Sequence, residues 1–383
     1  MKILYHHRIA SKDGQYVHIE EIIKSLKSQN HEIVMVAPAV AEKEEFGSDG
    51  GWISKVRHAM PQAISELLEV SYCFYDFFKM SYAIIKEKPD CIYERYNLFL
   101  PSGIWAAKLF NKKLILEVNA PLLEERSKYS GLSLSGLAKW SQEYCWKNAD
   151  KVLPVTDVLA DYVRNVGVHE EKIDVIANGI NTKEFMEKDV GMPVLETNGR
   201  LVVGFVGFCR EWHGLDKVMA LIAKPGYEHL FFLVVGDGPV KEELHQQAQQ
   251  LGVSDRFHFT GLVNRDEMPA WLNVIDIALQ PSVVPYASPL KMLEYMAKGK
   301  AIVAPDTPNI RELLTDGENA LLFTENDLDS FCEKISLMVD DNELRHHVEK
   351  NAKQSIHTNK LTWDNNASRI VAHFEQLAKV THD

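Results

Sequence analysis

Short runs of β-branched and aromatic residues alternate along this chain with longer stretches in which apolar residues recur with a helical period. The stretch 17–29, for example, has its isoleucines and Leu26 on one helical stripe. Strands and helices that alternate in this way are typical of parallel sheets with crossover helices. In the first half we predict strands at 2–5, 32–37, 91–93, 113–118, 151–155 and 173–176, and a further helix at 137–149.

The same pattern begins again in the second half, with strands expected at 201–206, 230–235, 257–259, 275–279 and 301–304. Between the halves, the segment 187–200 contains Gly191, Pro193, Asn198 and Gly199 and shows no periodicity, as is typical of a linker. A chain of 383 residues exceeds what one hydrophobic core usually supports. We therefore predict an α/β protein with doubly wound, Rossmann-like domains at 1–187 and 201–360, a linker at 188–200 and a last helix at 361–383.

The most apolar window, 67–85, contains Phe74, Phe78 and Tyr82 but is interrupted by charged residues such as Asp76. Its helical spacing predicts a helix that packs on the core of the first domain, with a membrane-docking helix as the alternative. No stretch approaches the apolar length needed to span a bilayer, and the N-terminus is too polar for a signal peptide. We therefore expect a cytoplasmic protein, and a peripheral contact with the inner membrane face stays open.

Charge and cysteine usage exclude some classes of partner. The formal net charge of −12 argues against a nucleic-acid-binding protein, because a phosphate-facing surface needs concentrated Lys and Arg. Five cysteines lie far apart without a C-x-x-C pair, which favours reduced thiols over a disulfide framework or a zinc site. The histidine pairs at 6–7 and 346–347 lack the spacing of metal ligands. We expect no bound metal and no nucleic-acid partner.

The segment 285–305 carries the most informative pattern for chemistry. A proline-containing loop leads into an amphipathic helix and then into a short apolar strand. Backbone N–H groups at a helix N-terminus lack intrahelical partners and carry partial positive charge. Lys291 adds a full charge in the first turn, and Glu294 follows at i+3, where a carboxylate accepts hydrogen bonds from two hydroxyls. This predicts a site for a diphosphate beside a ribose, with an ordinary surface pair as the alternative.

Three segments carry a resemblance to a known family: SPLK at 288–291, EYMA at 294–297 and GK at 299–300. Together they resemble the donor-binding signature of the family-4 glycosyltransferases. These are retaining enzymes of the GT-B fold. Further family landmarks follow the same order, namely NGIN at 178–181, VGDGP at 235–239, FTG at 259–261 and DIALQPS at 276–282. The resemblance implies two Rossmann-like domains that face a cleft, with the C-terminal helix crossing back to the first domain. It also implies a nucleotide-sugar donor held by Ser288, Pro289, Leu290, Lys291 and Glu294.

The turn after the first strand of the second domain departs from the family pattern. An Arg and a Lys usually flank this turn in the family, but here those positions hold Phe208 and His213. We predict that Arg210 reaches the same phosphates, with Gly207 opening the turn and His213 as a further donor or, alternatively, a turn-capping residue. Together with Lys291, Arg210 would stabilise the charge that develops on the departing diphosphate.

Three other positions complete the predicted site. The family has two glutamates separated by seven residues, the first of which recognises the transferred sugar; Glu294 matches the second, but Tyr286 stands at the first. Asn119 occupies the place where many members have a histidine near the reacting sugar, and a plain strand-end turn residue is the alternative reading. Gly14 lies in the loop after the first strand and resembles the glycine loop that closes over the donor phosphate or the acceptor.

The predicted function is that of a retaining, metal-independent glycosyltransferase. It would move a sugar from a nucleotide-diphosphate sugar to a glycan, a lipid-linked acceptor or a small molecule, with the leaving phosphate as base. A non-catalytic nucleotide-sugar-binding protein of the same fold is the alternative. A dinucleotide-dependent oxidoreductase is excluded because Lys241 stands where a third glycine would follow Gly236 and Gly238.

Overall fold

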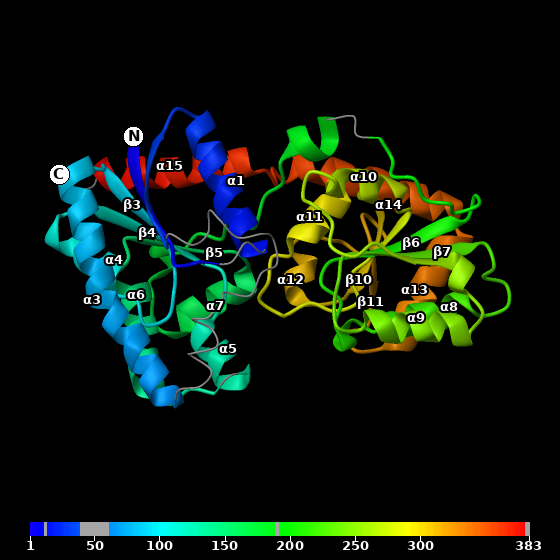
Figure 1. Ribbon diagram of the computed structural model, residues 1–383. Helices are drawn as coiled ribbons and strands as arrows, with labels where there is room; N and C mark the ends of the chain where they lie inside the picture. Colours follow the sequence, from blue (N-terminus) through cyan, green and yellow to red (C-terminus); the bar gives the residue numbers. More distant parts are fainter. Residues whose placement is uncertain (11–13, 39–60, 130, 188–190, 380–383) are drawn as a thin grey trace. The chain divides into compact units, whose positions relative to one another are not determined.

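The computed structural model describes residues 1–10, 14–38, 61–129, 131–187 and 191–379 (Figure 1). By its internal contacts the chain forms two compact units, one made of 1–178 with 363–383 and the other of 179–362. The chain therefore enters the second unit before the expected bound at 187, because Ile180 and Phe185 are buried in that unit's core.

The first unit is built on a parallel five-stranded sheet with the order β2-β1-β3-β4-β5. Its register places Leu4 between Val34 and Ile92. The strands are β1 (Lys2–His6), β2 (Glu32–Val36), β3 (Cys91–Arg95), β4 (Lys113–Val118) and β5 (Lys151–Pro154). The helices are α1 (Gly14–Ser28), α3 (Gln62–Glu87), α4 (Ser102–Leu109), α5 (Leu122–Tyr129), α6 (Ser135–Asn148), α7 (Asp157–Asn165) and α15 (Trp363–Lys379).

The expected strand at 173–176 is not formed. This segment follows β5 as extended chain and donates backbone hydrogen bonds from Asp174 to Val152 and from Ile176 to Pro154. Only Ile173 bridges to β5, opposite Val152. Because Pro154 has no N–H, it cannot return a hydrogen bond, and a regular ladder cannot form there.

The second unit contains a parallel six-stranded sheet with the order β11-β10-β9-β6-β7-β8. Apolar cores cover both faces of this sheet, as the doubly wound pattern predicts. The strands are β6 (Leu201–Val206), β7 (Leu230–Val235), β8 (Phe257–Phe259), β9 (Ile277–Leu279), β10 (Ala301–Pro305) and β11 (Leu321–Phe323). The helices are α8 (Leu215–Ile222), α9 (Lys241–Gln250), α10 (Met268–Val274), α11 (Leu290–Ala297), α12 (Pro308–Arg311), α13 (Leu328–Asp340) and α14 (Asn342–Thr358).

The C-terminal helix α15 returns to the first unit, as predicted, and packs on α1 (Figure 1). The ring of Trp363 meets that of His18 at a centroid distance of 4.8 Å. Arg369 and His373 both bind the carboxylate of Asp174, at 2.8 and 2.6 Å. These contacts fix the last helix on the unit that holds the first strand.

The helix predicted from the apolar window is α3, but its orientation is opposite to the expected one. Its aromatic side chains Phe74, Phe78 and Tyr82 are exposed, whereas Glu69 and Asp76 are buried. The prediction that the aromatic residues pack on the core is therefore wrong. The buried acids have partners elsewhere in the unit, which is why they can face inward.

No helix within the described residues is both long enough and apolar enough to cross a membrane.

Candidate functional site

The loop from β9 to α11 is held in place by a buried asparagine. Asn309, which is fully buried, donates from Nδ2 to the carbonyl oxygens of Val284 and Ala287, at 3.1 and 2.8 Å. Pro289 then takes an extended backbone conformation, with ψ at 118°, so that helix α11 begins at Leu290. The start of α11 is thus positioned by contacts outside the helix. Sequence reasoning missed Asn309, because its partners are backbone atoms remote in the sequence.

Lys291 lies in the first turn of α11 and is partly buried. Its Nζ lies 4.4 Å from the centroid of the Phe205 ring, at the end of β6. Burial lowers the pKa of Lys291 to about 8. It forms no ion pair with any residue that the structure describes, so this cation is available for an anion from outside the protein.

Gly207 leaves room for the Lys291 ammonium group. Its φ of +133° is unfavourable for other residues, and a Cβ at this position would lie 2.9 Å from Nζ of Lys291. The backbone after β6 and the first turn of α11 therefore approach each other closely, at the carboxyl edge of the sheet where α/β proteins bind ligands.

Glu294 lies one turn further along α11 and is buried. Burial raises the pKa of its carboxyl group, and Arg265 opposes this increase from 3.9 Å away. The structure shows no ion pair between Glu294 and Lys291, so the alternative of an ordinary surface pair does not describe them. Arg265, just before α10, was not singled out from the sequence, because it lies far from Glu294 along the chain.

Arg210 lies in the loop after β6 and is exposed. Its guanidinium carbon is 4.9 Å from the ring centroid of Phe208 and 5.0 Å from that of Trp212. Stacking between two aromatic rings restricts the guanidinium while leaving its edge open to an anion. Arg210 also lines a cavity of about 580 Å³, together with Trp212, Leu215, Ser282, Phe323 and others; neither Lys291 nor Glu294 lines it.

His213 is buried against Phe205, with ring centroids 4.9 Å apart. Its Nδ1 accepts a hydrogen bond from the backbone N–H of Arg210 at 3.0 Å, so the ring caps its own turn. Burial, with Lys291 and Arg210 nearby, lowers the pKa of His213 to about 4. The neutral ring with an accepting Nδ1 carries its proton on Nε2, which leaves that N–H as a donor.

The glycines of the VGDGP segment leave space for the backbone of the loop that follows β6. A Cβ at Gly236 would lie 2.1 Å from the carbonyl oxygen of Gly207, and one at Gly238 would lie 2.0 Å from that of Cys209. Backbone N–H groups of Gly207 and Cys209 bond to Val235 and Asp237 in return. These glycines therefore have a packing role, which explains a motif without a third glycine.

Comparison with known proteins decides the family. The model of the glycosyl transferases group 1 matches residues 192–355, and that of glycosyltransferase family 4 matches residues 12–184. The chain belongs to the family-4, group-1 glycosyltransferases. An uncharacterized glycosyltransferase of Methanocaldococcus jannaschii, MJ1069, is 23% identical over 374 residues, which cover 95% of each chain. The 2-deoxystreptamine glucosyltransferase of Streptomyces kanamyceticus is 32% identical over 130 residues, 31% of this chain and 33% of its own.

Solved structures show that this glycosyltransferase has the GT-B fold. HepE of Anabaena, crystallised in complex with UDP, matches with a TM-score of 0.72 at 19% identity and covers 98% of this chain and 100% of its own. Sucrose-phosphate synthase of Thermosynechococcus elongatus matches with a TM-score of 0.72 at 15% identity and covers 99% of this chain and 100% of its own.

Asn119 of the glycosyltransferase lies in the first unit, just after β4. Its Nδ2 donates to Glu117, which also accepts from Tyr93 at 2.6 Å and pairs with Arg95 at 3.0 Å. Burial works to raise the pKa of Glu117, but His18 and Arg95 outweigh it and hold the pKa far below its usual value. Asn119 is thus attached to a buried ionised network. Gly14 is the first residue of α1, and the loop residues before it lie outside the described residues.

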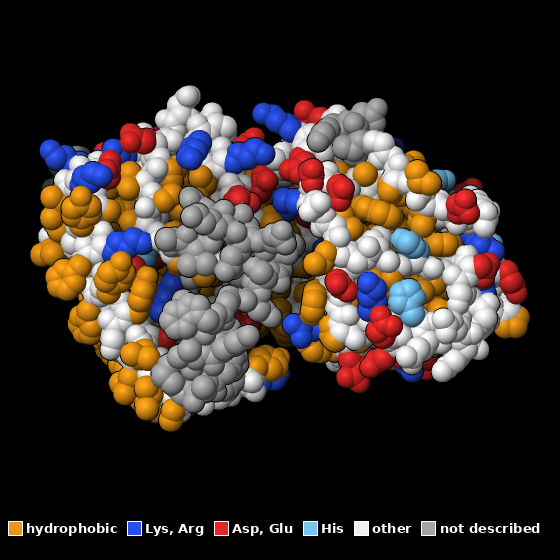
Figure 2. Space-filling view, in the orientation of Figure 1, with side chains coloured by type: hydrophobic (Ala, Val, Ile, Leu, Met, Phe, Trp, Pro, Cys, Tyr) orange, Lys and Arg blue, Asp and Glu red, His pale blue; other side chains and the backbone are white. Residues whose placement is uncertain are grey.

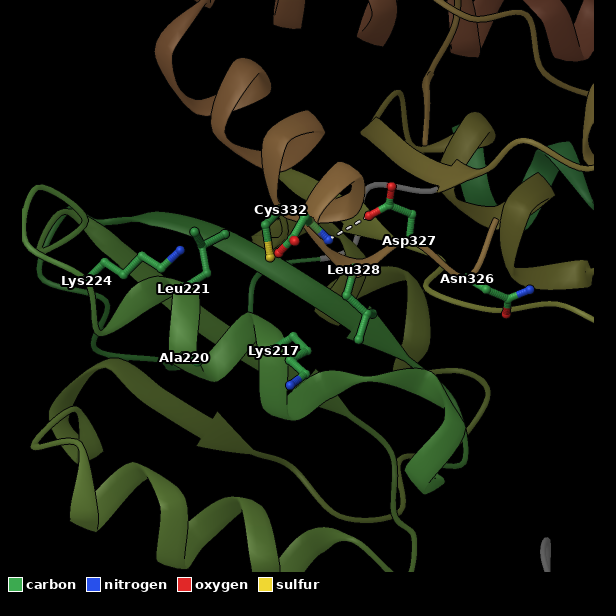
Figure 3. Close-up of a pocket in the computed structure, with 9 residues that line it drawn as sticks. Lys217, Ala220, Leu221, Lys224, Asn326, Asp327, Leu328 and Cys332 are labelled. Atoms are coloured by element: carbon green, nitrogen blue, oxygen red, sulfur yellow. Dashed lines mark hydrogen bonds between the residues drawn. The ribbon is translucent and has the colours of Figure 1, made fainter. Parts of the chain in front are cut away.

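Another hollow in the second unit holds none of the predicted site residues. It has a volume of about 430 Å³ and lies beside α8 and the start of α13, and Lys217, Leu221 and Cys332 are among its lining residues (Figure 3). At its rim, Asp327 caps α13 by accepting from the backbone N–H groups of Asp329 and Ser330. The carboxylate of Asp327 therefore serves the helix.

Among the residues that the structure describes, no group of three or more His, Cys, Asp or Glu side chains is placed to hold a metal ion.

Proposed function

We infer that this glycosyltransferase transfers a hexose from a nucleotide-diphosphate sugar, with retention of configuration and without a metal, to a glycan, a lipid-linked acceptor or a small molecule. One observation carries the inference: among the described residues, the partly buried ammonium group of Lys291 has no counter-ion at the start of α11, one turn before the buried Glu294. HepE was crystallised with UDP, and the Streptomyces relative is a glucosyltransferase, which supports a uridine diphosphate hexose as donor.

In this proposal the protein stabilises the charge that develops on the leaving diphosphate. Lys291 and the positive end of α11 lie closest to that charge, and the Nε2–H of His213 donates to it. Arg210 binds the outer phosphate from its place between Phe208 and Trp212. Ser288, Pro289 and Leu290 shape the start of the helix, and Gly207 leaves the space for the phosphates. The departing phosphate takes the acceptor's proton on the same face of the sugar.

Other residues recognise the rest of the donor and the acceptor. Glu294 accepts hydrogen bonds from the ribose hydroxyls, and Arg265, 3.9 Å away, favours the charged form of its carboxyl group. Tyr286 contacts the transferred sugar in place of a carboxylate. Asn119 acts near the reacting sugar, and Gly14 belongs to the loop that closes over the donor phosphate or the acceptor. We place the enzyme in the cytoplasm, since its five free thiols suit a reducing compartment.

A thermal-shift panel of nucleoside diphosphates and their sugars tests the donor site. At a hundredfold excess over Kd, the preferred ligand is expected to stabilise the wild type by about 2.7 kcal/mol. Glu294→Ala removes the acceptor for the ribose hydroxyls and is expected to weaken binding at least about tenfold, which halves that stabilisation. The melting temperature without ligand is the control for folding. A full response in the variant would remove Glu294 from the site.

Nucleotide binding is expected to weaken as pH rises above about 8, the pKa of Lys291 in the free protein. The bound diphosphate favours the charged form, so above that pH binding must take up a proton and Kd rises by up to about tenfold per pH unit. Calorimetric titration of UDP on both sides of this pH measures the effect. Lys291→Met should show a flat profile, and an equally flat wild-type profile would contradict the role of Lys291.

A further inference from the structure

The outward face of α3 is an apolar surface that no described part of the chain covers. The exposed fractions of Phe78, Tyr82 and Ile85 are 69%, 67% and 63%. With side chains of roughly 150–250 Å² each, the face leaves on the order of 1,000 Å² of mainly apolar area in water. A typical monomer exposes patches of only about 300–600 Å². The members of this face, called the α3 face below, are Ile64, Leu67, Leu68, Ser71, Phe74, Tyr75, Phe78, Tyr82 and Ile85.

The inner contacts of α3 prevent this face from turning inward. Glu66 accepts backbone hydrogen bonds from Ser133 and Leu134, at 2.9 and 2.6 Å. Glu69 pairs with Arg126 at 2.7 Å, and Asp76 with His6 at 3.0 Å.

Rotation of the helix would break these contacts and take one of its two carboxylate partners away from the buried His6, which opposes the rotation. The exposure of the α3 face is therefore built into the fold.

The α3 face has the composition of an interfacial helix. None of its exposed side chains from Ile64 to Ile85 is charged, and all of these residues are described. Phe and Tyr predominate toward its carboxyl end, and tyrosine suits a boundary with an apolar side and a wet side. The helix has 26 residues and is thus about 39 Å long, which allows it to lie along a flat surface.

Lysines gather at the carboxyl end of the α3 face. Lys86 and Lys88 follow it directly, although Lys86 pairs with Glu87 at 3.4 Å, and Lys108 lies on α4, which packs beside α3. Within the described part of the chain, Lys88 and Lys108 take part in no ion pair, although the protein is acidic as a whole. Figure 2 shows the hydrophobic side chains along the edge of the first unit where Figure 1 draws α3, with Lys and Arg side chains, and some Asp and Glu side chains, at the upper end.

We propose that the α3 face docks the first unit on a lipid bilayer that contains anionic lipid. The aromatic and aliphatic side chains enter the boundary between headgroups and acyl chains, and the lysines contact anionic headgroups. Lys88 and Lys108 would gain no partner from the uncharged α3 face of a second copy, whereas anionic headgroups attract them. The lysines therefore favour a bilayer over a second copy of the chain. An enzyme held in this way reaches acceptors carried on lipid, and only this consequence rests on the proposed function.

Vesicle co-sedimentation of the full chain, without donor, tests the proposal. Wild type is expected to bind vesicles of equal parts phosphatidylcholine and phosphatidylglycerol, and to bind phosphatidylcholine alone more weakly. Phe78→Glu with Tyr82→Glu should reduce partitioning at least about tenfold. Val194→Glu with Leu337→Glu, which adds the same charge at exposed apolar positions of the second unit, should leave it unchanged.

Lys86→Gln and Lys88→Gln are each expected to lower the preference for anionic vesicles by about fivefold. Both side chains are exposed, so this arm stays informative even if the double glutamate variant fails to fold. Failure of wild type to sediment with either vesicle would overturn the proposal, as would unchanged binding by the folded α3 variant. So would a vesicle-independent dimer that Phe78→Glu dissociates, since the partner would then be a second copy. None of these results bears on donor binding.

Discussion

Lys291→Met is expected to lower kcat/KM for release of nucleoside diphosphate from the preferred donor by about 10²–10³-fold. Methionine keeps much of the length of the side chain but removes the charge that, in the proposed mechanism, faces the leaving group. Loss of one preorganised donor at a developing negative charge typically costs this much, about 2.7–4 kcal/mol in the transition state. Because the Lys291 ammonium group lies over the Phe205 ring, the terminal methyl group of methionine can lie against the same ring with little disturbance.

Lys217→Met is the matched control for this variant. Lys217 lies on α8 in the same unit, is half-exposed, and contacts only Asp216 at 3.8 Å among its ion-pair partners in the described residues. Its activity should stay within about twofold of wild type. If both variants retain wild-type turnover of the donor, the charge of Lys291 has no part in the reaction.

His6→Gln is expected to lower the free energy of unfolding by about 3–5 kcal/mol at neutral pH. His6 is buried between two carboxylates, with Nε2 3.0 Å from Asp76 and Nδ1 2.7 Å from Glu94. Burial alone would lower the pKa of His6, but Asp76 and Glu94 outweigh it and raise the pKa to about 10. The variant leaves two buried acids facing a neutral amide. A urea titration followed by circular dichroism measures the loss.

The pH dependence of the loss in free energy of unfolding distinguishes removal of the His6 charge from removal of the packing of its ring. In wild type, the charged His6 stabilises the fold fully below its unfolded pKa of 6.5, and this contribution is lost as pH rises through about 10. In the variant, the buried acids take up protons more readily in the folded state, so its stability should increase as pH falls from neutral toward 5. The difference in free energy of unfolding between the variant and wild type should therefore become smaller as the pH falls.

His346→Gln serves as the control for the substitution itself. His346 is exposed and its Nδ1 lies 2.9 Å from Glu349, so the cost of its replacement should stay below about 0.5 kcal/mol. If His6→Gln costs as little as His346→Gln, the buried charge triad of the first unit does not hold α3 in place.

The sequence pattern predicted most of the sheet architecture, because buried parallel strands are short apolar runs with clear boundaries. It missed β11, which has only three residues at the sheet edge. It also gave α3 the wrong orientation. Apolar periodicity assumes that acids face water, and the partners that let Glu69 and Asp76 face inward, Arg126 and His6, lie far away in the sequence.

The candidate site could be located from the sequence where its residues are local. Lys291 and Glu294 share one helix turn, so their spacing already places them on one face. The stacking of Arg210 follows from neighbours at i±2, but the pattern gave no signal for it. Arg265 and Asn309 could not be found, because each acts on a residue or backbone segment brought near only by the tertiary fold.

A crystal structure of the full chain with a nucleoside diphosphate bound tests the central claim most directly. The account predicts that the diphosphate lies at the start of α11, within hydrogen-bonding distance of the Lys291 ammonium group and beside Gly207, with the ribose hydroxyls on Glu294. A diphosphate bound in another part of the molecule, with Lys291 still unpaired, would contradict it.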